Sequence, residues 1–135
     1  MYDIEEIRRR FAEDHFATNA AGARIDSVDD GYARCSLTLG DIHRNAAGGV
    51  MGGVAFTLAD FAFAVASNAD NTQTVSLCAQ ITYTSPARGG ELIAEARRQK
   101  EGRSTCFYVV SITDELGTQV ATVTVTGFIK RNTEK

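Results

Sequence analysis

The hydrophobic pattern of this chain is helical in two places and alternates with a period of two residues over most of the remainder. Ile4, Ile7 and Phe11 recur at helical spacing among charged residues, which predicts a short amphipathic helix. Between positions 55 and 66 almost every residue is apolar, so a helix there would be hydrophobic on nearly all of its faces. We expect this second helix to be buried on most sides together with its single charge, Asp60.

The rest of the chain predicts antiparallel strands joined by short turns. The turn signals include Asp29-Asp30-Gly31 between the first two strands and Glu101-Gly102 later. The predicted strands cover 24–28, 32–39, 74–84, 91–100, 104–113 and 118–130. These elements predict an α+β fold in which a curved antiparallel sheet wraps around one long central helix. One helix covers only one face of a sheet, so we expect the other face to meet solvent or a second copy of the sheet.

Length and charge narrow the class of protein. The 135 residues form one domain, 1–135, and the formal net charge of -3 comes without a basic stripe. Nucleic acid is therefore not expected as a partner. The N-terminus has no apolar run followed by a cleavage site, and the apolar helix is too short to span a membrane. We expect a cytoplasmic protein that does not enter a membrane.

Cysteine and histidine usage predicts neither disulfides nor a metal centre. The three cysteines, Cys35, Cys78 and Cys106, are widely spaced in strand-like segments, which is typical of reduced core thiols. The two histidines do not have the paired spacing of metal ligands. No metal and no cofactor are expected.

The junction between the loop 45–51 and the apolar helix carries the candidate chemistry. Gly52 and Gly53 allow a tight turn and let another group approach the first N–H groups of the helix, which have no partner within it. Asp60 follows eight residues later, about 12 Å along a helix axis. A buried carboxylate without a partner is costly, so it is usually paired, hydrated or used.

These residues and the order of elements resemble the hotdog-fold thioesterases, in particular the group typified by the phenylacetate-pathway thioesterase. The resemblance extends downstream through the turn 83–90 and covers nearly the whole chain. One departure concerns Met51, which stands where the group usually has histidine before Gly-Gly. The matching positions are His43, Asn45, Gly48, Gly52, Gly53, Leu58, Ala59 and Asp60.

The resemblance implies a hotdog fold and hydrolysis of an acyl-CoA to the free acid and coenzyme A. It makes Asp60 the nucleophile or general base and the Gly52 amide the group that polarises the carbonyl. Asn45 would orient the carbonyl or the attacking water, and Ser76 would lie beside the carboxylate. Further candidate contacts with the substrate, including the phosphates of coenzyme A, are His43, Met51, Gly53, Arg88 and Arg103.

Geometry adds a constraint. Two groups about 12 Å apart on one helix cannot both touch one carbonyl, because reacting groups must lie within about 3 to 3.5 Å. We therefore expect Gly52 of one subunit to act with Asp60 of another, as in the family, whose active sites lie at dimer interfaces. A homodimer or a homotetramer built as a dimer of dimers follows. The phenylalanines of the helix favour an aryl or medium-chain acyl group; they are Phe56, Phe61 and Phe63.

Several alternatives remain. Asp60 can serve as a structural carboxylate, His43 as a loop hydrogen-bonding residue, Ser76 as a core hydroxyl, and the two arginines as solvated surface. A non-catalytic acyl-CoA-binding or regulatory module is a different functional class, and Met51 is compatible with it. An enoyl-CoA hydratase or dehydratase is disfavoured, because such enzymes use a histidine with a carboxylate and no histidine is found in or next to the helix.

Overall fold

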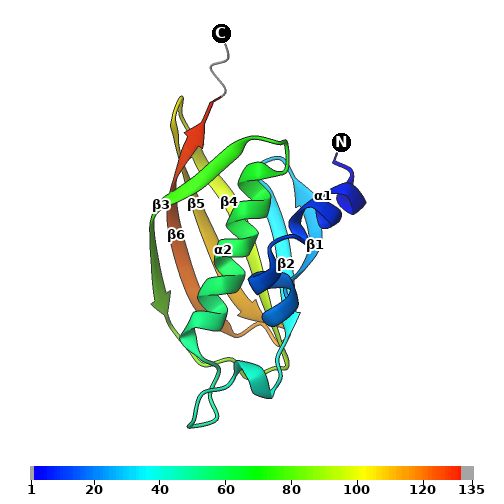
Figure 1. Ribbon diagram of the computed structural model, residues 1–135. Coiled ribbons are helices and arrows are strands. Elements are labelled where there is room, and N and C mark those ends of the chain that lie inside the picture. The colour runs from blue at the N-terminus through cyan, green and yellow to red at the C-terminus, as the bar shows by residue number, and fades with distance from the viewer. Residues whose placement is uncertain (1, 132–135) are drawn as a thin grey trace.

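The computed structural model describes residues 2–131 and forms a single curved sheet around one long helix (Figure 1). η1 is a π-helix and η2 a single 3₁₀ turn. In chain order the elements are α1 (Ile4–Phe11), η1 (Phe16–Ala20), β1 (Arg24–Asp29), β2 (Tyr32–Thr38), η2 (Asp41–His43), α2 (Gly52–Asn68), β3 (Gln73–Tyr83), β4 (Glu91–Glu101), β5 (Thr105–Asp114) and β6 (Gln119–Lys130).

The six strands pair in the order β1-β2-β4-β5-β6-β3, and every pairing is antiparallel. α2 lies along the concave face of this sheet, as Figure 1 shows. The predicted α+β architecture, with one central helix inside a curved sheet, is therefore confirmed. The strand order also explains the edges: β1 and β3 each have a strand on one side only.

Helix α1 covers the β1 end of the sheet. Its N-cap, Asp3, accepts hydrogen bonds from the backbone N–H groups of two first-turn residues, and the predicted apolar residues Ile7 and Phe11 are buried. The Nε and Nη2 of Arg8 both donate to the carbonyl of Ile25 in β1. Between α1 and β1 the chain forms η1 and then turns at Gly22, whose φ is 85°.

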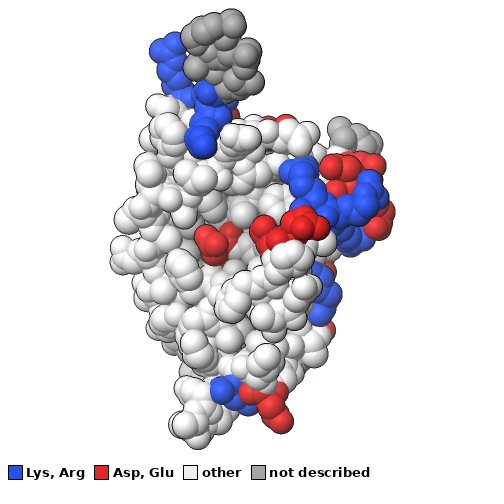
Figure 2. Space-filling view, viewed as in Figure 1, with Lys and Arg blue, Asp and Glu red and all other residues white. Residues whose placement is uncertain are grey.

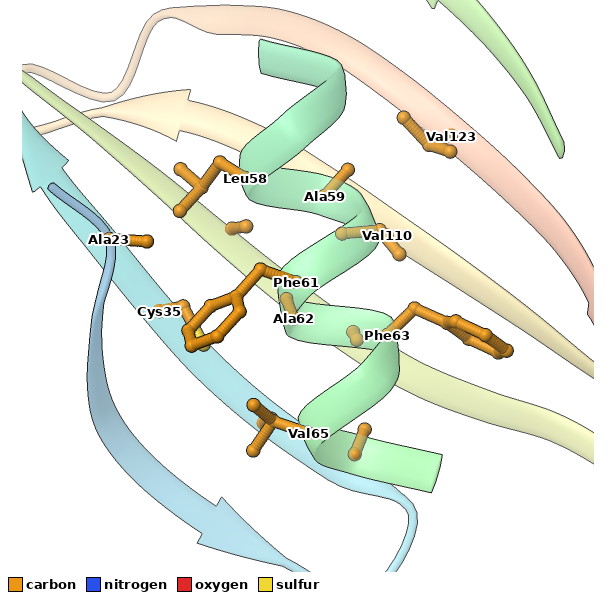
Figure 3. Packing of buried hydrophobic residues seen from close by; sticks show 14 of the residues in the cluster. Ala23, Cys35, Leu58, Ala59, Phe61, Ala62, Phe63, Val65, Val110 and Val123 are labelled. Carbon is orange, nitrogen blue, oxygen red and sulfur yellow. The ribbon is translucent and has the colours of Figure 1, made fainter. Parts of the chain in front are cut away.

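The core is built from one side of α2 and the concave face of the sheet (Figure 3). Leu58, Ala62 and Val65 are completely buried there, and the ring of Phe63 packs edge-on against Tyr108 at 5.2 Å. The prediction that α2 is buried on most sides is confirmed, because only Gly53 and Asp60 of this helix are exposed, but the expectation that Asp60 is buried with it is wrong for the single chain. Asp60 is exposed, because the stripe of the helix that points away from the sheet meets only the short N-terminal segment.

Strand β3 is the open edge of the sheet. It contains a β-bulge between Ser76 and Cys78, and its side chains are largely exposed. Because Cys78 lies on this edge, the prediction that all three cysteines are core thiols is wrong for Cys78, whereas Cys35 and Cys106 are buried as expected. All three thiols are free. Within residues 2–131, no helix is long and apolar enough to cross a membrane.

Candidate active site

The loop before α2 is held together by Asn45. Its Oδ1 accepts hydrogen bonds from the backbone N–H groups of Ala47 and Gly49, and its own N–H donates to the carbonyl of Gly49 at 2.8 Å. The left-handed φ of 90° at Gly48 lets the chain turn back within this loop. These bonds use only Oδ1 of the side chain, so the exposed Nδ2 amide group is not needed to hold the loop.

His43 is a structural residue rather than a free site residue. It is only 6% exposed, its Nδ1 accepts a hydrogen bond from the N–H of Gly40, and its Nε2 lies 2.8 Å from the carbonyl of Ala21. Both ring nitrogens are thus engaged with backbone groups that fix the loop against the N-terminal segment. Neither nitrogen is left for a ligand, but His43 lines the hollow next to Met51 and Gly53, so its contact with the substrate stays a prediction.

Gly52 is the first residue of α2 and borders a hollow of about 430 Å³. Met51 and Tyr83 line the same hollow, together with residues of the β3–β4 loop. The hydroxyl of Tyr83 donates to the carbonyl oxygen of Gly52 at 2.7 Å. Gly53 lies outside this hollow and lines a neighbouring one with Met51 and Phe16. Met51, 54% exposed, therefore separates the two spaces at the head of the helix.

Asp60 borders a different hollow, of about 480 Å³, between α2 and the N-terminal segment. Asp14, His15 and Phe16 form its other wall, and Phe56 contributes an aromatic surface beside the carboxylate. Figure 2 shows acidic side chains over the middle of this face of the molecule, surrounded mostly by uncharged atoms. Desolvation, and secondarily the negative charge of Asp14, raises the pKa of Asp60 above its ordinary value.

His15 lines this hollow, so the expectation that no histidine lies next to the helix is wrong. Its Nδ1 lies 3.2 Å from Nδ2 of Asn19, and its ring lies at the border of the space that contains Asp60. No sequence signal indicated this proximity. It depends on η1, a five-residue π-helix that carries the chain back across the exposed stripe of α2.

Gly52 and Asp60 do not share a hollow. Both belong to the continuous helix α2, so eight residues separate them by about 12 Å along its axis. The hollow at Gly52 does not include Asp60, and the hollow at Asp60 does not include Gly52. A single chain therefore presents an amide group and a carboxylate at two separate places.

The remaining predicted residues are dispersed. Ser76 pairs with Gly127 of β6. A Cβ added at Gly127 would meet Phe63 of α2, so Gly127 faces the helix and its partner Ser76 lies on the same side of the sheet. Arg88 lies in the turn before β4 and Arg103 in the turn after it, at opposite ends of an 11-residue strand. The single chain therefore does not bring the two arginines together.

Comparison with known proteins identifies the family. The profile of the Thioesterase superfamily matches residues 47–121, which include the end of the loop, α2, the strands β3, β4 and β5, and the beginning of β6. The chain is also 31% identical to the acyl-coenzyme A thioesterase PaaI of Escherichia coli, over 81% of this chain and 79% of that protein. The chain belongs to the thioesterase superfamily. Its helix wrapped in a curved antiparallel sheet is the hotdog fold.

Solved structures agree with this membership. The PaaI protein of the Escherichia coli phenylacetic acid degradation operon superposes with a TM-score of 0.82 at 25% identity, covering 96% of this chain and 97% of that one. A hypothetical thioesterase from Streptococcus pneumoniae, solved with coenzyme A, gives a TM-score of 0.81 at 25% identity, covering 89% of this chain and 96% of that one.

The match to a sequence relative from Archaeoglobus fulgidus, 36% identical over 73% of this chain, spans 65% of that relative's length.

Proposed function

We propose that this protein is an acyl-CoA thioesterase that works as an oligomer, with Gly52 of one subunit and Asp60 of another at each active site. The observation that carries the proposal is the placement of these two groups on one helix but in separate hollows. The superfamily membership and the coenzyme A bound by the streptococcal neighbour support the substrate class.

The chemistry follows from the two groups. The N–H of Gly52, at the positive end of the helix, donates to the carbonyl oxygen of the thioester and to the oxyanion that forms from it. Removing one such donor typically costs about 3 to 4 kcal/mol of transition-state stabilisation. Asp60 supplies the second function by one of two routes, and both consume one water and release the acid and the thiol of coenzyme A.

In the first route, Asp60 accepts a proton from a water molecule as that water attacks the carbonyl carbon; the C–S bond then breaks and the coenzyme A thiolate takes up the proton. In the second, the carboxylate itself attacks the carbonyl carbon, the C–S bond breaks and coenzyme A leaves as the thiolate; water then hydrolyses the anhydride, which releases the acid, restores Asp60 and supplies the proton that the thiolate takes up. Both routes require ionised Asp60, so its raised pKa predicts that activity falls on the acid side. Asn45, whose Nδ2 is not needed by the loop, would orient the carbonyl or the water.

The open edge of the sheet supports a dimer. β3 has 11 residues, a strand on one side only, and exposed apolar side chains that include Val75, Leu77 and Tyr83. Such an edge pairs readily with another chain. Pairing β3 with β3 of a second copy would continue the sheet and bring the two concave faces side by side. Ser76, on the helix-facing side of β3, would then lie at the subunit boundary.

A dimer of dimers would use the opposite face of the sheet. Along β5, β6 and β3 the outward side chains are mainly Thr, Ser, Gln and apolar residues, whereas the outward side of β4 carries charges such as Glu95 and Arg97. Val75, Phe107 and Phe128 are exposed on the uncharged half. This half is suited to packing against another sheet.

The acyl group would lie in the hollow that contains Asp60. Phe16 and Phe56 line it, and the largely buried Phe61 forms part of its floor, which favours an aryl or medium-chain acyl group. Phe63, considered for this role from the sequence, packs on Tyr108 in the core instead. Met51 borders the hollow at Gly52 and the neighbouring hollow at Gly53. There it would influence substrate preference rather than supply a reacting group.

Thiol release from a panel of aryl and straight-chain acyl-CoAs tests the proposal. The wild type should release coenzyme A, and Asp60→Asn should lower kcat by on the order of a thousandfold, as expected for loss of a catalytic base or nucleophile. Asp26→Asn is a matched control, because it removes a β1 carboxylate that lies outside the hollow. Equal activity of Asp60→Asn and the wild type would refute the role of Asp60. Tight binding without turnover by the wild type would instead identify a binding module.

A further inference from the structure

The first turn of α2 lacks the usual means of ordering a helix N-terminus. The N-cap position is occupied by Met51, whose side chain makes no capping hydrogen bond. The next two residues, Gly52 and Gly53, have the greatest backbone freedom of any residue type. Without further support, this turn would sample several conformations and its free N–H groups would change direction.

Tyr83 provides that support from the end of β3. Its hydroxyl donates to the carbonyl oxygen of Gly52 at 2.7 Å, so the bond joins the first turn of α2 to the sheet. The backbone N–H of Met51 donates to the carbonyl of His43 at 2.9 Å, which holds the preceding residue. The head of the helix is thus ordered by groups from other parts of the chain rather than by its own sequence.

The fit between Tyr83 and Gly52 is also steric. A Cβ at Gly52 would lie 2.7 Å from the Tyr83 hydroxyl oxygen and 2.9 Å from Cζ, closer than real Cβ contacts. Gly52 is not among the glycines with left-handed φ, so occupied space is what excludes a side chain there. At Gly53 an added Cβ would meet only the flexible end of Met51, at 3.1 Å. The aromatic ring therefore defines one side of the space next to Gly52.

We propose that Tyr83 is a positioning residue for thioester hydrolysis: its hydroxyl holds the Gly52–Gly53 turn so that the Gly52 N–H keeps one direction toward the substrate carbonyl. This inference rests on the proposed function, which gives Gly52 that role. Donors to an oxyanion are effective when they are oriented before the charge develops.

The substitution Tyr83→Phe tests the hydroxyl independently of the ring, because phenylalanine keeps the ring but cannot donate a hydrogen bond. Tyr32→Phe is the matched control, since the Tyr32 hydroxyl donates to Oε2 of Glu95 at 2.6 Å and Tyr32 is not among the residues that line the hollow at Gly52. We expect Tyr83→Phe to lower kcat about tenfold with KM within about twofold, less than the loss of a whole oxyanion donor. Tyr32→Phe should keep the wild-type kcat.

A second measurement reports the order of the turn directly. Backbone ¹⁵N relaxation should give lower order parameters for Gly52 and Gly53 in Tyr83→Phe than in the wild type. Unchanged kcat and unchanged order parameters would overturn the positioning role, as would a loss of kcat explained by dissociation of the oligomer in size-exclusion chromatography. A wild type without turnover on any acyl-CoA would overturn the proposed function, whereas an active wild type and an equally active Tyr83→Phe would overturn only this inference.

Discussion

Asp14 and Asp60 line the same hollow, although Asp14 lies in the N-terminal segment and Asp60 in the middle of α2. Desolvation is the larger cause of the raised pKa of Asp60, and the negative charge of Asp14 adds to it. The proposed catalytic carboxylate therefore has a like-charged neighbour that makes its ionisation harder. The same wall carries His15.

Asp14→Asn should move the acid limb of the pH–rate profile to lower pH. Removing the negative charge makes ionisation of Asp60 easier, and the ionised form is the active one in both routes. The shift should be partial, because desolvation remains. The measurement is kcat/KM against pH, which reports groups of the free enzyme.

Glu13→Gln is the control for this prediction. It removes a carboxylate from the same segment, but Glu13 does not line the hollow. The pH–rate profile of Glu13→Gln should lie closer to the wild-type profile than the profile of Asp14→Asn does. If the acid limb of the Asp14→Asn profile moved to higher pH, the negative charge of Asp14 would not be what hinders ionisation of Asp60.

Two inactive variants should restore activity when mixed. Asp60→Asn lacks the carboxylate, and Gly52→Ala places a methyl group against Tyr83 and so disturbs the helix head. If each site takes Gly52 from one subunit and Asp60 from the other, a mixed dimer contains one intact site. Equal mixing with free exchange should give about a quarter of wild-type activity, because half of the dimers are mixed and half of their sites are intact.

The mixing experiment requires subunit exchange, which mild denaturation and refolding of the combined variants provides. Each variant refolded alone serves as the control and should stay inactive. Differently tagged chains show whether mixed dimers have formed. If they have formed and no activity returns, Gly52 and Asp60 of the same subunit act in one site.

Leu77→Lys should disrupt the oligomer. Leu77 is 62% exposed at the bulge of the open strand, and a lysine on a sheet edge opposes pairing with another chain. We expect a smaller species in size-exclusion chromatography, an unchanged far-ultraviolet circular dichroism spectrum, and at least about a tenfold loss of kcat/KM through loss of shared sites.

Leu116→Lys is the matched control for the edge variant, because Leu116 is 67% exposed but lies in the turn between β5 and β6. It should keep the wild-type oligomer and activity. If Leu77→Lys remained an active oligomer of wild-type size, the β3 edge would not be the dimer contact.

Asp114→Asn should destabilise the fold without touching the proposed reacting groups. The carboxylate of Asp114, 2% exposed, accepts hydrogen bonds from the backbone N–H groups of Arg88, Gly89, Leu116 and Thr118. It thereby joins the connection between β3 and β4 to the turn of the β5–β6 hairpin. Its loss should lower the free energy of unfolding by about 2 to 4 kcal/mol, measured by urea denaturation.

The same carboxylate predicts a pH dependence of stability. Burial of Asp114 opposes its ionisation, but the backbone donors outweigh burial and hold its pKa well below the ordinary value of 3.8. Its contribution is therefore fully present above that value and is lost as the pH falls below it. The difference between wild type and Asp114→Asn in urea should shrink between pH 7 and pH 3; a constant difference would contradict this account.

Local patterns predicted the elements well. Apolar residues at helical spacing around Ile7 located α1, and the alternation in β6 put Val123 and Val125 on one side of the strand, where both are buried. The left-handed turn at Gly31 also followed from its residue type. In each case the information lies within a few residues, so the preference of the backbone and the need to bury one face decide the outcome.

Non-local contacts accounted for the errors. The apolar sequence of α2 predicted that Asp60 is buried with the helix, yet Asp60 is exposed on the single chain, since it lies on the side of α2 that points away from the sheet. The sequence left open whether His43 binds the substrate or holds the loop, and only the structure shows that its ring nitrogens are bonded to the backbone of Gly40 and Ala21. The exposure of Cys78 follows from the strand order and the bulge, which are absent from the local sequence pattern.

The sequence by itself determined the family, the single charge on an apolar helix, and the separation of about 12 Å between Gly52 and Asp60, because helix geometry depends only on residue spacing. Only the tertiary structure decided what surrounds those groups. It placed Asp14 and His15 beside Asp60 and the Tyr83 hydroxyl on Gly52. Such neighbours arise from the packing of distant segments, and spacing along the chain carries no information about them.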